Sequence, residues 1–143
     1  MALHVLVAPS GFKESLGAEE VADCIEAGVL RVLPDAEVTK APMVDGGEGF
    51  AKAIVEATGG TLHDATVMGP VGEPVDAHYG FLGDASGSPL TAVLEMASAA
   101  GLWLVPREVR DPSGTTTYGV GELIKAALDA GAERILLGCG DSG

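Results

Sequence analysis

The sequence predicts an α/β fold that opens with a Rossmann-like parallel βαβα segment and continues into a mixed sheet with an antiparallel hairpin. Residues 3–8 form a nearly unbroken apolar run, typical of a strand covered on both faces, and residues 18–32 follow with helical periodicity. Residues 75–81 instead alternate apolar and polar side chains, which indicates a half-exposed strand. The hydrophobic content is 47% with only 4% aromatic residues, a balance that favours sheets covered by helices.

The first 60 residues are predicted to form the Rossmann-like domain. The strand at 3–8 is broken by Pro9, Ser10 and Gly11, and Pro34 stops the helix at 18–32. A short strand at 36–41 completes a βαβ unit, whose crossover should be right-handed. A second helix, through Phe50 and Val55, ends at Gly59 and Gly60.

Residues 61–143 are predicted to begin a second, mixed α/β domain. A turn at 69–72 separates two strands, 61–68 and 75–81, and so predicts the antiparallel hairpin. The elements expected after it are a strand at 90–96, a helical turn at 97–101, a helix at 119–130 and a strand at 134–137. The chain then stops in a glycine-rich loop, 138–143, and we expect an incomplete fold, because folded domains seldom end in this way.

The charge of the chain argues against nucleic acid and anionic membranes as partners. Eight basic residues against 21 acidic ones give a formal net charge of -13. Such a protein repels nucleic acid backbones and anionic membranes. Negative ligands would need local donors or Mg²⁺ to offset this field.

The sequence also predicts a cytoplasmic location. The first residues run directly into a strand without the features of an export signal. The most apolar stretch, 90–105, is interrupted by Glu95 and falls short of the about 20 residues that a bilayer span needs. Cys24 and Cys139 match neither a disulfide framework nor a metal pattern.

The loop after the first strand carries candidate ligand groups. In open α/β sheets, ligands bind at the carboxyl ends of strands, where this loop lies. Lys13, beside Ser10 and Ser15, could hold a phosphate or carboxylate oxygen. The glycine spacing of a phosphate-binding loop is absent, so a solvated surface lysine is the alternative.

A second candidate is the segment Asp45–Gly49, at a predicted strand-to-helix turn. Its glycines permit close approach by a ligand and expose backbone amides. Asp45 could hold Mg²⁺ or accept a proton from a substrate hydroxyl. Asp45 as N-cap, with Glu48 three residues later, would equally form a capping box, and the pattern leaves both open.

Two further segments combine glycines with polar groups. Residues 115–122 place four hydroxyls at a helix entrance, where they could bind an anion or simply cap the helix. Residues 138–143 match G-x-G-x-x-G after a strand, the dinucleotide fingerprint. That fingerprint normally lies on the first βα turn, with an acidic residue about 20 positions later, so the match is weak. The histidines lack a metal-site spacing and receive no catalytic role.

Taken in order, these segments resemble the glycerate kinase type-1 family. The matching segments are 8–15, 45–49, 115–122 and 138–143, with 69–74 and 94–97 also fitting. The resemblance covers essentially the whole chain but only the first part of such an enzyme. Many members have Asp-Ser where this chain has Ser10-Gly11, a difference that removes a carboxylate from that loop.

The resemblance implies transfer of the ATP γ-phosphoryl group to a hydroxyl of D-glycerate with Mg²⁺, in a site between two α/β domains. Lys13 would neutralise substrate or phosphate charge, and Asp45 would be a metal ligand or base. The implied substrate- or phosphate-binding residues are Ser10, Ser15, Gly46, Gly47, Glu48, Thr115, Thr116, Thr117, Gly138, Gly140, Asp141 and Ser142. The 143 residues alone are expected to be inactive, and a homo-oligomer is compatible with the sequence.

Two alternatives from other classes stay open at this point. The terminal glycine pattern would suit a fragment of a nicotinamide-binding oxidoreductase. The short length would suit a non-catalytic α/β interaction module.

Overall fold

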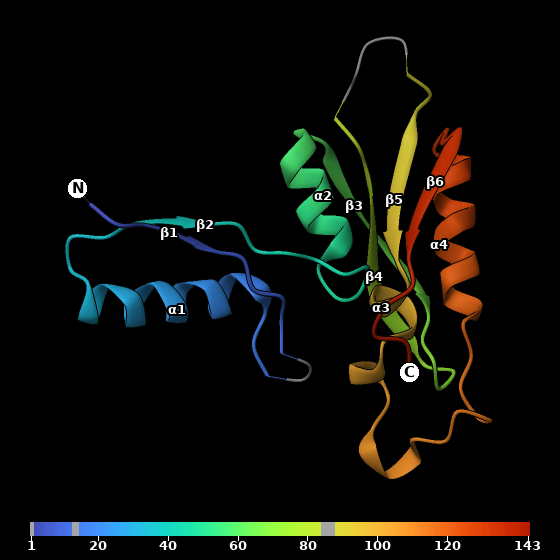
Figure 1. Ribbon diagram of the computed structural model, residues 1–143. Coiled ribbons are helices and arrows are strands. Elements are labelled where there is room, and N and C mark those ends of the chain that lie inside the picture. The colour runs from blue at the N-terminus through green and yellow to red at the C-terminus, as the bar shows by residue number, and fades with distance from the viewer. Residues whose placement is uncertain (1, 13–14, 84–87) are drawn as a thin grey trace. The chain divides into compact units, whose positions relative to one another are not determined.

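A computed structural model describes residues 2–12, 15–83 and 88–143. It confirms a mixed α/β fold (Figure 1). The elements are β1 (His4–Val7), α1 (Ala18–Val32), β2 (Glu37–Lys40), α2 (Phe50–Thr58), β3 (Thr61–Met68), β4 (Pro74–Phe81), β5 (Thr91–Glu95), α3 (Met96–Ala100), α4 (Tyr118–Asp129) and β6 (Arg134–Gly138). Two short 3₁₀ helices, Leu102–Leu104 and Arg107–Val109, connect α3 to α4. Lys13 lies outside the described residues.

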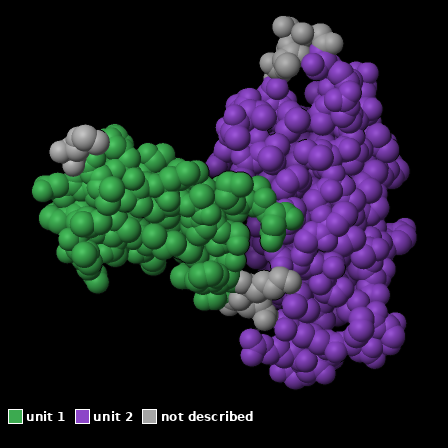
Figure 2. Space-filling view, in the orientation of Figure 1, with its two compact units in different colours: residues 1–45 green, residues 46–143 purple. Residues whose placement is uncertain are grey.

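The chain divides into two compact units, residues 1–45 and 46–143 (Figure 2). The sequence predicts a domain boundary after residue 60, and the compact units instead divide before α2, because of the packing of that helix. Ala51 and Val55 of this helix are buried against Val93 of β5. The helix therefore belongs to the second unit, although it follows the βαβ segment directly in sequence.

The first unit is the predicted βαβ segment. β1 and β2 pair in parallel, with His4 opposite Glu37 and Val7 opposite Lys40, and α1 connects them. Lys40 joins β2 to α1 through Asp23 at 2.6 Å and Glu26 at 3.0 Å, and these two carboxylates raise the pKa of Lys40.

A local cap starts α1. The carboxylate of Glu20 accepts a hydrogen bond from the amide of Gly17 at 3.1 Å. The helix ends at Val32, two residues before Pro34, as expected for a residue that cannot continue a helix. Both boundaries match those predicted from the sequence.

The second unit is a four-stranded mixed sheet in the order β3-β4-β5-β6. The pairs β3–β4 and β4–β5 are antiparallel, which confirms the hairpin, and β5–β6 is parallel. Gly72, with φ of 91°, lies in the hairpin turn.

Strand β5 lies at the centre of the core. Ala92 and Leu94 pack in one apolar cluster with α3 and α4, whereas Val93 packs with α2 on the opposite face. All three are fully buried, because side chains alternate between the two faces of a strand and helices cover both. This double cover explains why Ala92, Val93 and Leu94 are apolar in succession instead of alternating with polar residues.

None of the helices in the described part of the chain is long and apolar enough to cross a membrane.

Candidate functional site

Two glycine-rich segments of the second unit interlock at their backbones. The amide of Gly140 donates to the carbonyl of Gly46 at 2.9 Å. A Cβ on Gly138 would lie 2.5 Å from the oxygen of Gly46, and a Cβ on Gly140 would lie 2.6 Å from the nitrogen of Gly47. Glycine is required at both positions because the backbones of the two segments approach more closely than any side chain would permit.

A buried carboxylate holds the start of α2. Glu95, the last residue of β5, is only 2% exposed. Its Oε1 accepts from the amide of Gly49 at 3.1 Å, and its Oε2 accepts from the amide of Ala51 at 2.7 Å. The free amides and the positive end of the helix dipole favour a negative charge at this position.

This arrangement corrects the capping-box alternative for Asp45 and Glu48. The helix begins at Phe50 and its N-cap is Gly49, which has φ of 85° and makes no side-chain cap bond. The cap comes from Glu95 on a neighbouring strand, so Asp45 is not an N-cap. Asp45 is an exposed residue in the described chain.

His78 and Ser98 pack behind Glu95. The hydroxyl of Ser98 accepts from the backbone amide of His78 at 2.9 Å and lies 3.3 Å from its Nδ1. The Nε2 atom of His78 is 3.8 Å from Oε1 of Glu95, and it is buried without a hydrogen-bond partner among the described residues. The histidine therefore turns one ring nitrogen toward Ser98 and the other toward the carboxylate.

Asp141 contacts the same glycine segment. Its Oδ2 accepts from the amide of Glu48 at 3.2 Å. Its carbonyl accepts from the amide of Leu102 at 2.9 Å, and its φ of 55° is positive. The loop continues beside α3, where Ser142 forms a bridge with Gly101 and the amide of Gly143 donates to Ala100.

The contacts of this loop differ from those of a dinucleotide fingerprint. In that motif the glycines leave room for a pyrophosphate at the start of a helix. Here Gly138 and Gly140 lie against the backbone of residues 46–47 instead. The glycine pattern is thus accounted for by contacts within the protein.

The predicted threonines have three different surroundings. The hydroxyl of Thr115 donates to the carbonyl of Gly143 at 3.3 Å, which joins this residue to the loop. Thr116 accepts from the amide of Tyr118 at 3.1 Å and so supports the entrance of α4. Thr117 is the N-cap of α4 but makes no side-chain cap bond.

The structure thus brings part of the predicted set together. The residues that meet in the second unit are Gly46, Gly47, Glu48, Thr115, Gly138, Gly140, Asp141 and Ser142. Ser10, Ser15 and Asp45 are exposed residues of the first unit. Their roles, and that of Lys13, stay predictions.

The described residues contain no group of three or more histidine, cysteine or acidic side chains that could hold a metal ion. Mg²⁺ in nucleotide sites usually takes one or two carboxylates, with water and substrate phosphates as its other ligands. An exposed carboxylate such as Asp45 fits that requirement. A magnesium site at Asp45 stays a prediction.

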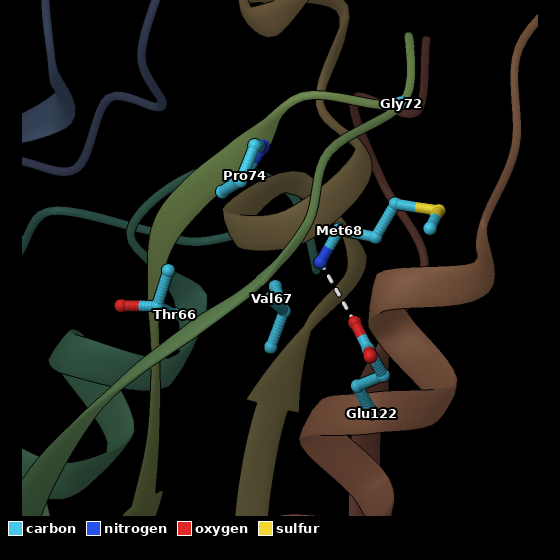
Figure 3. Close-up of a pocket in the computed structure, with 6 residues that line it drawn as sticks. All are labelled: Thr66, Val67, Met68, Gly72, Pro74 and Glu122. Carbon is cyan, nitrogen blue, oxygen red and sulfur yellow. Dashed lines mark hydrogen bonds between the residues drawn. The ribbon is translucent and has the colours of Figure 1, made fainter.

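A shallow pocket of about 270 Å³ lies beside the β3–β4 hairpin (Figure 3). Its lining residues are Thr66, Val67, Met68, Gly72, Pro74 and Glu122. Oε2 of Glu122 accepts from the amide of Met68 at 2.7 Å, which ties α4 to β3. The pocket includes none of the predicted site residues, so we assign it a structural role.

The sequence motifs did not point to Glu95, His78 or Ser98 as residues of the site. One signal was present for the first of them: Glu95 is a single carboxylate inside an apolar stretch, residues 90–105. A charged residue within a buried strand must be paired or hydrogen-bonded, and its partners should then lie near the end of that strand. His78 and Ser98 carry no comparable signal.

Comparison with known proteins agrees with the earlier resemblance. The sequence profile of the glycerate kinase family matches residues 5–143. The glycerate kinase of Bacillus subtilis (strain 168) is 51% identical over 140 residues, which are 98% of this chain and 36% of that protein. The glycerate 2-kinase of Escherichia coli (strain K12) is 48% identical, with the same two shares.

A solved structure supports the fold. A crystal structure from Salmonella typhimurium LT2, assigned as a glycerate kinase 2, aligns with a TM-score of 0.66 at 49% identity. The alignment covers 99% of this chain and 37% of that one. The chain thus spans little more than a third of the length of its relatives. It belongs to the glycerate kinase family.

Proposed function

We propose that the protein transfers the γ-phosphoryl group of ATP to a hydroxyl of D-glycerate and so forms phosphoglycerate. The observation that carries this proposal is the interlocking of residues 46–49 with residues 138–143. Both segments belong to the motifs through which the chain resembles glycerate kinases. They lie at the carboxyl ends of the parallel pair β5–β6, where open α/β sheets bind ligands.

The chemistry assigns separate tasks to the predicted residues. Phosphoryl transfer needs positioning and charge neutralisation more than covalent catalysis. Asp45 would accept the proton of the attacking hydroxyl or hold Mg²⁺, and Lys13 would offset the charge of a carboxylate or phosphate. The hydroxyl oxygen then forms its bond to the γ-phosphorus as the bond to ADP breaks. Mg²⁺ would supply positive charge to the phosphates when bound.

The charges at the glycine loop support a need for cations. The amides of Glu48, Gly49 and Ala51 already donate to carboxylates of this chain. An anionic substrate that approaches this segment would therefore meet negative charge instead of free amide donors. We propose that Mg²⁺ offsets this repulsion.

The family assignment also favours the kinase proposal over the alternatives considered for the sequence. It argues against a nicotinamide-binding oxidoreductase, as do the backbone contacts of Gly138 and Gly140. It argues equally against a non-catalytic interaction module, because named relatives are glycerate kinases.

The test uses a protein that contains this chain together with the remaining length found in its relatives. We expect ADP release that requires ATP, Mg²⁺ and D-glycerate together. Asp45→Asn and Lys13→Ala should each lower kcat by at least about 10²-fold, as loss of a transition-state charge contact does. Asp35→Asn, at another exposed carboxylate of the first unit, is the control and should leave kcat unchanged.

Two results would refute the proposal. One is the absence of glycerate-dependent ADP release in folded protein. The other is NAD(P)-dependent oxidation of a hydroxy acid in the same preparation. A near-normal kcat in the Asp45 and Lys13 variants would instead contradict only the roles proposed for these two residues and would leave the proposed activity standing.

We infer a cytoplasmic location from the cysteines. Cys24 and Cys139 are both exposed and free, which suits a reducing compartment. Alkylation of both thiols in freshly lysed cells, followed by mass spectrometry, tests this inference. Recovery of either cysteine mainly as an oxidised species would contradict it.

A further inference from the structure

The carboxylate of Glu95 is buried at a point where the helix could be capped more simply. Removal of a carboxylate from water is strongly unfavourable unless hydrogen bonds compensate. Serine, threonine or aspartate at the N-cap of α2 would serve the helix with a side chain that stays in water. Gly49 occupies that position instead, and Glu95 reaches it from β5.

The glycine segment is held at both ends by residues from two paired strands. Glu95 and Gly138 are directly opposite each other in the β5–β6 register. Glu95 binds the amides of Gly49 and Ala51, at the end of the segment where α2 begins. At the other end, the loop that follows Gly138 binds the carbonyl of Gly46 through its amide at position 140.

The direction of the Glu95 carboxylate is fixed by its neighbours. His78 lies 3.8 Å from Oε1, and Ser98 bonds both the backbone amide and the ring of that histidine. Ser98 itself is 5% exposed. The carboxylate of Glu95 thus lies between the buried Nε2 atom of His78 and the two backbone amides that it binds, which restricts its rotamer.

We propose that Glu95 is a positioning residue that holds segment 46–49 in the shape in which the protein binds glycerate. This inference rests on the proposed kinase function and adds to it a residue that does not itself touch the substrate. The segment contains two glycines with positive φ, Gly46 at 91° and Gly49 at 85°. Such a backbone has many alternative conformations, and a buried carboxylate with two amide partners selects one of them.

Glu95→Gln isolates this role because it preserves the shape of the side chain. The amide oxygen can still accept from one backbone N–H, but the NH₂ group then faces the other N–H, donor against donor. The segment must shift to relieve that conflict. A displacement of about 1 Å at a substrate-positioning element costs on the order of 10²-fold in rate.

The matched control acts on the same helix at its other end. Thr58 Oγ1 accepts from the amide of Gly83 at 3.1 Å, so Thr58→Val removes a side-chain bond near the end of α2 without touching segment 46–49. Both variants should lower the Tm. Only Glu95→Gln should lower kcat per folded molecule and raise the KM for glycerate, with kcat/KM reduced by about 10²-fold.

The measurement is steady-state kinetics of the full-length protein, with the folded fraction determined by thermal unfolding. Kinetic constants for Glu95→Gln equal to those of Thr58→Val, per folded molecule, would overturn the inference. If Glu95→Gln does not fold, Glu95→Asp carries the same test, because its side chain is one methylene shorter and its carboxylate does not reach both amides. Absence of glycerate kinase activity in the wild-type protein would refute the proposed function instead. Failure of the inference about Glu95 and failure of the proposed function are therefore distinguishable.

Discussion

Substitution of Gly138 by alanine gives a direct measure of how tightly the two glycine segments are packed. The new Cβ would lie 2.5 Å from the oxygen of Gly46 and 2.7 Å from Cδ1 of Phe50. Phe50 can rotate, but the carbonyl belongs to the backbone and accepts the bond from Gly140. Gly138 does not have a positive φ, so alanine meets no conformational penalty of its own. The clash alone determines the effect.

The magnitude follows from two terms. Overpacking of a well-packed region costs about 1 to 3 kcal/mol. Displacement of the Gly46 carbonyl also weakens one hydrogen bond, worth about 1 kcal/mol. We therefore expect a loss of about 2 to 4 kcal/mol, or a fall in Tm of at least about 8 °C for a unit of this size.

The assay is thermal unfolding followed by the fluorescence of Trp103, the single tryptophan of the sequence, which lies in the second unit. The control is Gly121→Ala, inside α4, where a Cβ meets no atom within 4 Å. That variant should gain about 0.5 to 1 kcal/mol, because alanine favours a helix over glycine. A Gly138→Ala protein that unfolds at the wild-type temperature would refute the close-approach argument.

Two further substitutions test other parts of the chain. Glu122→Gln should weaken the hydrogen bond from the Met68 amide and lower the unfolding free energy of the second unit by about 1 kcal/mol, measured by chemical denaturation. A variant of normal stability with weaker glycerate binding would instead show that the pocket in Figure 3 has a direct role. The hydroxyl of Ser113, and to a lesser extent its amide, donate hydrogen bonds to the carboxylate of Asp111 and lower the pKa of Asp111. The charged carboxylate therefore stabilises the folded state above the unfolded pKa near 3.8. This stabilisation is lost as the pH falls through the lower pKa of the folded state. The wild-type advantage over Asp111→Asn should therefore shrink from about pH 5 to pH 2, and a constant difference in unfolding free energy would contradict the assignment.

Periodicity in the sequence predicted most of the individual elements. The helix at 18–32 and the hairpin strands agree with the structure because their apolar residues recur at the spacing of one buried face. Periodicity does not reveal which sheet a helix covers. For this reason α2 was correctly predicted as a helix, yet its packing against Val93 places it in the compact unit of residues 46–143 and not with the βαβ segment that precedes it.

The local motifs showed where glycines gather but not what they contact. Gly46 and Gly140 are 94 positions apart in the chain, and their hydrogen bond depends on β6 lying beside β5. Glu95 and Gly49 are likewise far apart, at 46 positions in the sequence. For the 45–49 turn, the only local hydrogen bonding that the sequence suggested was a capping box between Asp45 and Glu48. In the structure, the buried carboxylate of Glu95 caps the helix instead.

The same distinction explains the G-x-G-x-x-G pattern at 138–143. A glycine can be required because a ligand approaches the backbone or because another segment of the chain does, and both cases look alike in sequence. A Cβ test separates them: at Gly138 and Gly140 the space that a side chain would need is taken by residues 46 and 47. These glycines therefore act indirectly, because their backbone contacts set the position of segment 46–49. The proposed ligand roles therefore fall to polar side chains instead of these glycines. The Asp45 and Lys13 variants measure those roles, and the Glu95 variants measure how the position of segment 46–49 affects glycerate binding.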